Sequence, residues 1–184
     1  MTSNQQTLDQ FHTFTDRFTR VVDSIPAGGW TQPSPCAGWS TSDVLDHVLD
    51  SQRDFLSRHG LEVGEAPTGE PGDRWHAHVT AVRAALGDGE VLGTEFDSYF
   101  GPSTIGATLA TFYGLDLVVH RWDLARAGGV ETELRDDELD HVEACLDELG
   151  ENIYSQGACA PAVEPPADAT RAEAVIARTG RDPR

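Results

Sequence analysis

Apolar residues recur every three or four positions along most of this chain, which is the spacing of one face of an α-helix. In residues 4–24 the positions that follow this spacing are Leu8, Phe11, Phe14, Phe18, Val21 and Val22. Pro26 and the pair Gly28 and Gly29 come next, and both residue types end helices. The pattern therefore predicts a first helix over residues 4–24.

A second helix is predicted to begin after Ser40 and to run to about Arg58, before Gly60. Ser40 and Asp43 have the spacing of a capping box, in which the N-cap side chain and the third helical residue each hydrogen-bond to the other's backbone. The apolar positions that follow are Val44, Leu45, Val48, Leu49, Phe55 and Leu56. Residues 61–73 are rich in Gly, Pro and acidic residues, so they are predicted to form an exposed connection.

A third helix is predicted after this connection, with one apolar stripe and an end at Gly87 and Gly89; the stripe consists of Trp75, Val79, Val82 and Leu86. Residues 90–102 mix β-branched and aromatic residues with glycines, which favours a short extended segment or an ordered loop. The next helix is predicted from Ser103 or Thr104 to Ala127. It is apolar on nearly all sides, which is typical of a helix at the centre of a bundle.

A further helix is predicted over residues 136–151, whose stripe consists of Leu139, Val142, Leu146 and Leu149. A short amphipathic piece lies near residues 172–177 and could pack back on the body. Together these patterns predict an all-α protein with a single domain, residues 1–184. Its architecture is expected to be a four-helix bundle with short additional helices and loops.

The most distinctive polar residues are Asp116 and His120, four positions apart in an otherwise apolar helix. Residues at this spacing share one helix face, so the carboxylate and the imidazole can converge on one point. A divalent metal would neutralise the carboxylate and use the histidine, and His47 in the second helix would complete a site of three ligands. The alternative is an Asp–His ion pair inside a helical core.

The charge of the chain bears on its partners. It carries 31 acidic residues against 13 basic ones, a formal charge of −18, and every basic residue is an arginine. Such a balance repels phosphate backbones and anionic lipids, so nucleic acid and membrane are not expected partners. The N-terminus has no secretory pattern, and three cysteines without CxxC spacing favour reduced thiols, so we expect a cytoplasmic protein.

Other polar residues near the candidate ligands have two interpretations each. Asp123 could accept the second N–H of His120, or it could serve helix packing with Arg126 as its partner. Cys36 lies near a helix N-terminus and could be a nucleophile, although a small buried loop thiol is the simpler interpretation. The helix position of Arg121 points it away from His120.

The remaining histidines and tryptophans are expected to be structural or exposed. His76 and His78 lie two positions apart, which aims them to different sides of a helix, and both are predicted to be surface residues. Trp30 and Trp39 are expected to wedge their loop against the bundle, with pocket lining as the alternative.

Two motifs and the end of the chain resemble a known family. The motifs are PSPCAGWSTSDVLDHVL, residues 33–49, and DLVVHRWDLARAGG, residues 116–129, and the chain closes with RTGRDP, residues 178–183. The chain is similar to the DinB-like metal-binding superfamily, within it to the actinobacterial branch related to the N-terminal domain of mycothiol-dependent maleylpyruvate isomerase. This resemblance implies a four-helix bundle that holds one divalent metal through His47, Asp116 and His120.

The resemblance also implies a chemistry. Maleylpyruvate isomerases carry Glu at the position of Asp116 and a second, C-terminal domain, which we expect this chain to lack. We therefore expect a broader thiol-dependent S-transfer or isomerisation, with mycothiol as cosubstrate and a small electrophile as substrate. Zinc is the expected metal, and nickel, iron or manganese fit nearly as well. The pocket is expected to have apolar walls from residues such as Phe112, Tyr113 and Leu117.

Two other functions stay open on the residues alone. One is a hydrolase or lyase in which the metal activates water. The other is a non-catalytic binding or stress-response protein in which the metal only stabilises the bundle. No catalytic or cofactor-binding side chain of the protein is predicted, and homodimer formation stays open.

Overall fold

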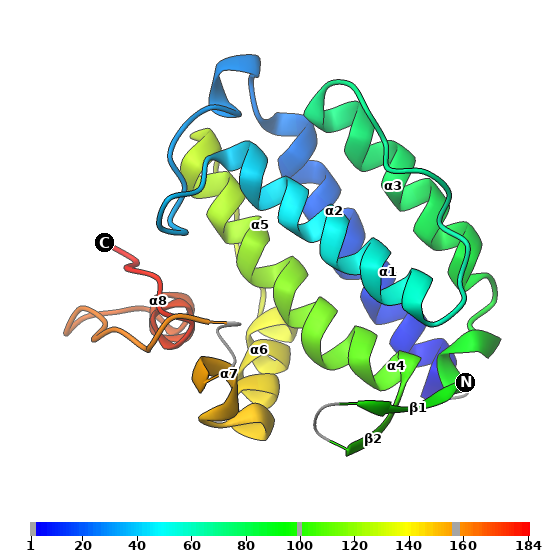
Figure 1. Cartoon of the computed structure of the whole chain (residues 1–184). Helices are drawn as coiled ribbons and strands as arrows, with labels where there is room; N and C mark the ends of the chain where they lie inside the picture. Colours follow the sequence, from blue (N-terminus) through cyan, green and yellow to red (C-terminus); the bar gives the residue numbers. More distant parts are fainter. Residues whose placement is uncertain (1–2, 99–100, 156–158) are drawn as a thin grey trace.

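The computed structural model describes residues 3–98, 101–155 and 159–184. Four long helices form its body: α1 (Ser3–Ser24), α2 (Thr41–Arg58), α3 (Pro71–Leu86) and α5 (Gly114–Gly128). Both α1 and α2 contact α3 and α5, so the four helices close into a bundle (Figure 1). The predicted all-α four-helix bundle is confirmed.

The N-terminus of α2 shows why the sequence places a helix there. The Ser40 hydroxyl accepts a hydrogen bond from the backbone N–H of Asp43 at 3.2 Å, and the Asp43 carboxylate accepts one from the backbone N–H of Ser40 at 2.8 Å. This is the predicted capping box, and it satisfies two backbone donors that the helix itself cannot. The preceding loop contains the short 3₁₀ helix η1 (Ala27–Gly29) and packs the buried Trp30 against the body, as predicted.

The segment before α5 contains the predicted extended residues, but the helix that follows is not the single unbroken α-helix predicted from Ser103 or Thr104. After the 3₁₀ turn η2 (Glu90–Gly93), strands β1 (Glu95–Ser98) and β2 (Gly101–Thr104) pair antiparallel. Helix α4 (Ile105–Thr108) then begins at Thr104, whose hydroxyl accepts a hydrogen bond from the backbone N–H of Ala107 at 3.0 Å. A π-helical turn, η3 (Leu109–Tyr113), joins α4 to α5.

Apolar periodicity could not locate this π turn. Over only five residues, the pattern of apolar positions is the same whether the backbone hydrogen bonds span four or five positions. Turns of this kind inside α-helices occur frequently at functional sites. Here the turn supplies Phe112 and Tyr113 to the pocket described below.

The prediction that His78 is a surface residue is wrong. His76 is exposed, but His78 is 1% exposed and lies between α3 and α2. Its Nε2 forms a 2.9 Å hydrogen bond with Oε1 of Gln52, which satisfies one of the two nitrogens of the buried imidazole. Burial, together with the charge of Arg53, lowers the pKa of His78 to about 4, so the ring is neutral at neutral pH.

The C-terminal part covers one side of the bundle. Helix α6 (Asp136–Leu149) packs on α5 through the predicted stripe and is followed by the short helix α7 (Asn152–Ser155). Helix α8 (Arg171–Arg178), predicted near residues 172–177, packs on α6. The Tyr154 hydroxyl donates to the carbonyl of Arg178 at 2.8 Å, which ties the end of α8 to α7.

Within the described residues, no helix has both the length and the apolarity needed to cross a membrane.

Candidate metal centre

The three predicted ligands come together in the structure. His47 lies on α2, and Asp116 and His120 lie one turn apart on α5. Oδ1 of Asp116 is 3.2 Å from Nε2 of His120 and 3.7 Å from Nε2 of His47. One donor atom from each residue lies within 4.8 Å of the other two, a spacing that allows all three to bind one ion.

The second carboxylate oxygen of Asp116 bears on what the three residues can bind. Oδ2 is buried and has no hydrogen-bond partner among the described residues. Burial opposes ionisation of Asp116, but His120 and then His47 outweigh it and hold the pKa of this carboxyl well below its ordinary range. Asp116 is therefore an anion with one oxygen still to be satisfied, which fits a bound cation.

His120 is fixed from its other side. The ring is almost fully buried, and Nδ1 forms a 2.8 Å hydrogen bond with Oδ2 of Asp123. This contact leaves Nε2 directed toward Asp116, the orientation that a metal-ligating histidine requires. Burial lowers the pKa of His120, but Asp116 and then Asp123 outweigh it and raise the pKa well above its ordinary value.

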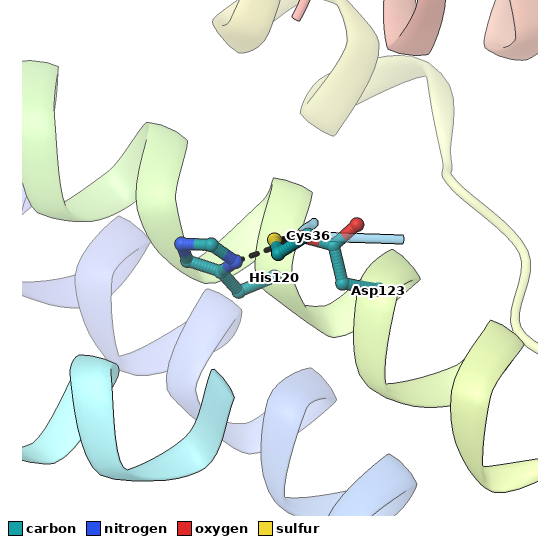
Figure 2. A group of neighbouring side chains, drawn as sticks. All are labelled: Cys36, His120 and Asp123. Atoms are coloured by element: carbon teal, nitrogen blue, oxygen red, sulfur yellow. Dashed lines mark hydrogen bonds and ion pairs between the residues drawn. The ribbon is translucent and has the colours of Figure 1, made fainter. Parts of the chain in front are cut away.

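The partner of Asp123 is not the expected Arg126. Arg126 lies over the ring of Trp122, with its guanidinium carbon 5.8 Å from the ring centroid. Asp123, fully buried, is instead paired with Arg181, whose Nη2 donates to Oδ2 at 2.9 Å. Cys36 donates to the same oxygen at 3.3 Å, and Figure 2 shows Cys36 beside Asp123 and His120.

Cys36, His120 and Asp123 form a second group with metal-ligand spacing. Nη2 of Arg181 lies 3.4 Å from Sγ of Cys36 and 2.9 Å from Oδ2 of Asp123, so a guanidinium already holds the position of a cation there. This arrangement favours a hydrogen-bonded support for His120 over a second metal site. The half-buried thiol of Cys36 is one of its hydrogen-bonding members.

A pocket of about 320 Å³ opens onto the three candidate ligands. Phe112 and Tyr113 line it as expected, together with Leu115, Val119 and Ile153. Leu117 does not line the pocket; it is fully buried in the core, because its position next to Asp116 turns it to another face of α5. The pocket is thus mostly apolar, with the candidate ligands at one side.

An acidic groove adjoins the centre on the side of α2. His47 is shared between the groove and the pocket, and Trp39 lines the groove with its ring centroid 5.1 Å from that of His47. The acidic lining consists of Asp43, Asp46, Asp50 and Asp54. Trp39 is 37% exposed, so the alternative interpretation holds for it: it lines this groove instead of wedging the loop against the bundle.

Two residues of the site were missing from the sequence-based prediction. Arg181 and Cys159 both line the pocket, and both come from the chain after α7. The closing motif RTGRDP contains Arg181, but no periodicity or ligand spacing connects it to His120. Arg121, in contrast, points away from the centre as predicted, and it pairs with Glu138 at 2.9 Å.

Comparisons with known proteins identify the family of the chain. A family model described as the mycothiol maleylpyruvate isomerase N-terminal domain matches residues 11–125, which include all three candidate ligands. Two proteins described as uncharacterized, from Mycobacterium tuberculosis strains CDC 1551 / Oshkosh and ATCC 25618 / H37Rv, are 26% identical over 131 residues. The match covers 65% of this chain and 65% of the length of each relative. Among solved structures there is no match.

Proposed function

Because the chain belongs to the mycothiol maleylpyruvate isomerase N-terminal domain family, we propose that it binds one divalent metal ion through His47, Asp116 and His120 and catalyses reaction of a small thiol with a small electrophile. The observation that carries the metal is Oδ2 of Asp116, which is buried and has no hydrogen-bond partner in the described part of the chain, at the point where two imidazoles converge. Zinc suits this set of nitrogen and oxygen donors best.

The number of protein ligands favours catalysis over a purely structural site. Three ligands leave a coordination position for an exogenous ligand, whereas structural zinc sites have four. When bound, the ion would lower the pKa of a thiol or water ligand and supply a nucleophile near neutral pH.

The residues of the chain have separate tasks in this proposal. Asp116 supplies the negative charge of the ligand set, and Asp123 holds the ring of His120 in place. Phe112, Tyr113 and Val119 give the pocket apolar walls that exclude water from an electrophile. The described lining contains no protein thiolate suited to attack, since burial raises the pKa of Cys159, the one cysteine that lines the pocket.

The choice of mycothiol as the thiol is supported by the family alone. Maleylpyruvate isomerisation is the reaction in the family's description, and this chain carries only part of the length of the relatives it matches. We therefore propose the broader reaction, S-transfer or thiol-assisted isomerisation, on a small electrophile that fits a pocket of about 320 Å³.

The test measures thiol-dependent consumption of 1-chloro-2,4-dinitrobenzene by the zinc-loaded protein, with mycothiol, with glutathione and without thiol. We expect a rate above the uncatalysed reaction that is highest with mycothiol. Asp116→Asn, which keeps the shape and removes the charge, should abolish the enhancement. Asp23→Asn is the matched control, because Asp23 is an exposed carboxylate on α1 that pairs with His76.

The alternatives predict other results. Metal-dependent hydrolysis of an ester, at a rate independent of every thiol, would indicate a hydrolase that activates water. One tightly bound metal ion without either activity would indicate a binding protein. Either result contradicts the thiol chemistry proposed here.

A further inference from the structure

Arg181 is a buried arginine that connects the end of the chain to the candidate metal centre. Its side chain is 9% exposed, and it donates to Oδ1 of Asp123 through Nε at 3.3 Å and to Oδ2 through Nη2 at 2.9 Å. A two-point contact of this kind fixes the plane of a carboxylate as well as its position. Asp123 can thus hold only the orientation that Arg181 allows.

The oxygen that Arg181 fixes is also the one that holds His120. Oδ2 of Asp123 accepts from Nη2 of Arg181 and hydrogen-bonds with Nδ1 of His120 at 2.8 Å. Nε2 of the same ring lies 3.2 Å from Oδ1 of Asp116. A continuous chain of contacts therefore runs from Arg181 through Asp123 and His120 to the candidate ligand set.

The backbone around Arg181 is shaped to hold the guanidinium at this place. Nη1 of Arg181 donates to the carbonyl of Thr179 at 2.8 Å, and Thr179 is fully buried. Gly180 has a φ of +81°, and a Cβ at this position would lie 2.5 Å from the carbonyl oxygen of Ala160. The close approach of the backbone at residue 180 to the backbone of Ala160 thus requires glycine next to Arg181.

Charge explains why Asp123 needs this partner. Asp123 is 0% exposed, and an unpaired carboxylate is costly in such a buried place. Cys36 also donates to Oδ2, but a thiol is a weak donor that carries no positive charge. Among the described residues, Arg181 and His120 both form ion pairs with Asp123, and of the two only the arginine carries a fixed positive charge.

From this geometry we propose that Arg181 is a positioning residue of the metal centre. It fixes Asp123, and Asp123 orients the imidazole of His120 for metal binding. The inference rests on the proposed function, since it concerns the same centre. It makes the C-terminal segment part of the centre, although the candidate ligands lie on α2 and α5.

The test is a double-mutant cycle with zinc affinity as the readout, measured on the full chain by competition with a chromophoric chelator. Arg181→Met should weaken zinc binding about 10- to 100-fold, the usual effect of losing the hydrogen-bond support of a ligating histidine. Asp123→Asn should have a similar effect. The double variant should bind no more weakly than the weaker single variant, because both changes break the same chain of contacts.

Two further variants separate positioning from general stability. Arg181→Lys keeps the charge and loses the two-point contact, so it should restore part of the affinity and carries the test if Arg181→Met does not fold. Arg178→Met removes a neighbouring arginine that pairs with the exposed Asp147 at 2.5 Å, and it should leave zinc affinity unchanged. The absorption spectrum of the cobalt-substituted protein should change with Arg181→Met and not with Arg178→Met.

The outcomes distinguish this inference from the proposed function. If the wild-type chain binds zinc and Arg181→Met binds it within twofold, Arg181 has no positioning role and the metal site stands. If the two single losses multiply in the double variant, Arg181 does not act through Asp123, and the inference is overturned. A wild-type chain that binds no divalent metal overturns the proposed function and this inference with it.

Discussion

Nε2 of His47 lies 3.7 Å from Oδ1 of Asp116, although the two residues belong to different helices of the bundle, α2 and α5. This contact depends on the packing of the two helices, whereas the contact between Asp116 and His120 is set by one turn of α5 alone. The candidate centre therefore joins a local pair to one distant side chain, and only the bundle fold completes it.

The first prediction concerns metal stoichiometry. His120→Ala should reduce bound zinc from about one ion per chain to nearly none after dialysis, because it removes a ligand and leaves two from separate helices. His76→Ala is the matched control: this histidine also pairs with an aspartate, Asp23 at 2.8 Å, but it is exposed on α3. Elemental analysis of the purified proteins checks the result. Undiminished zinc in the His120 variant would remove His120 from the ligand set.

A second prediction concerns the fold without metal. Chelation should leave the helical circular dichroism intact and lower the melting temperature, because the bundle has a large apolar core of its own. At free zinc 1,000 times above the dissociation constant, binding adds about 4 kcal/mol to stability. For a chain of this size that corresponds to roughly 10 °C in melting temperature. Loss of helical signal on chelation at room temperature would instead make the metal a requirement for folding.

The sequence was most informative where contacts are local. The capping box of Ser40 and Asp43 and the pair of Asp116 and His120 depend on fixed helical spacings, and the structure has each of these contacts. The approach of Asp123 to His120 is a spacing of the same kind, three positions along α5. The stripe of α6 follows the same logic, since its four predicted apolar residues are all buried.

Contacts between distant segments could not be predicted in this way. Arg181 reaches Asp123 only because the chain after α7 returns to the bundle, and no periodicity encodes that return. His78 was misassigned because a histidine in a mixed pattern gives no sign of the glutamine that meets it from another helix. The π turn was missed because its hydrogen bonds, and not its residue types, distinguish it from an α-helix.

A third prediction concerns acid stability. The pKa of His78 falls from its ordinary value of 6.5 to about 4 in the folded chain, chiefly by burial. Between these values the unfolded chain binds a proton that the folded chain does not, so the contribution to stability is complete above pH 6.5 and is lost as the pH falls to about 4. The size of this loss is roughly 3 kcal/mol.

Urea unfolding at several pH values between 7 and 4 checks this prediction. His78→Gln should reduce the loss of stability over this range by roughly 3 kcal/mol, since glutamine does not titrate. His76→Gln, in an exposed position of the same helix, should leave it nearly unchanged. His12 and His141 also have lowered pKa values from burial, but they remain in both variants and cancel in the comparison. If the free energy of unfolding fell equally with pH in the wild type and in the His78 variant, His78 would not be the group that causes the loss.

The last prediction concerns Gly180, which has a φ of +81° and lies against the backbone of Ala160. Gly180→Ala should destabilise the fold by more than about 2 kcal/mol, because the added Cβ would meet the Ala160 carbonyl oxygen at 2.5 Å in addition to the strain of the left-handed backbone. Gly129→Ala is the matched control: Gly129 has a φ of +70°, but a Cβ there meets nothing within 4 Å. It should cost about 1 to 2 kcal/mol from backbone strain alone.

Zinc affinity separates the two variants further. A displaced residue 180 moves Arg181 away from Asp123, whereas residue 129 only caps the end of α5. We expect weaker zinc binding for Gly180→Ala and unchanged binding for Gly129→Ala, measured by chelator competition at a temperature where both variants are folded. If Gly180→Ala retained wild-type affinity, the C-terminal segment would not be a part of the metal centre.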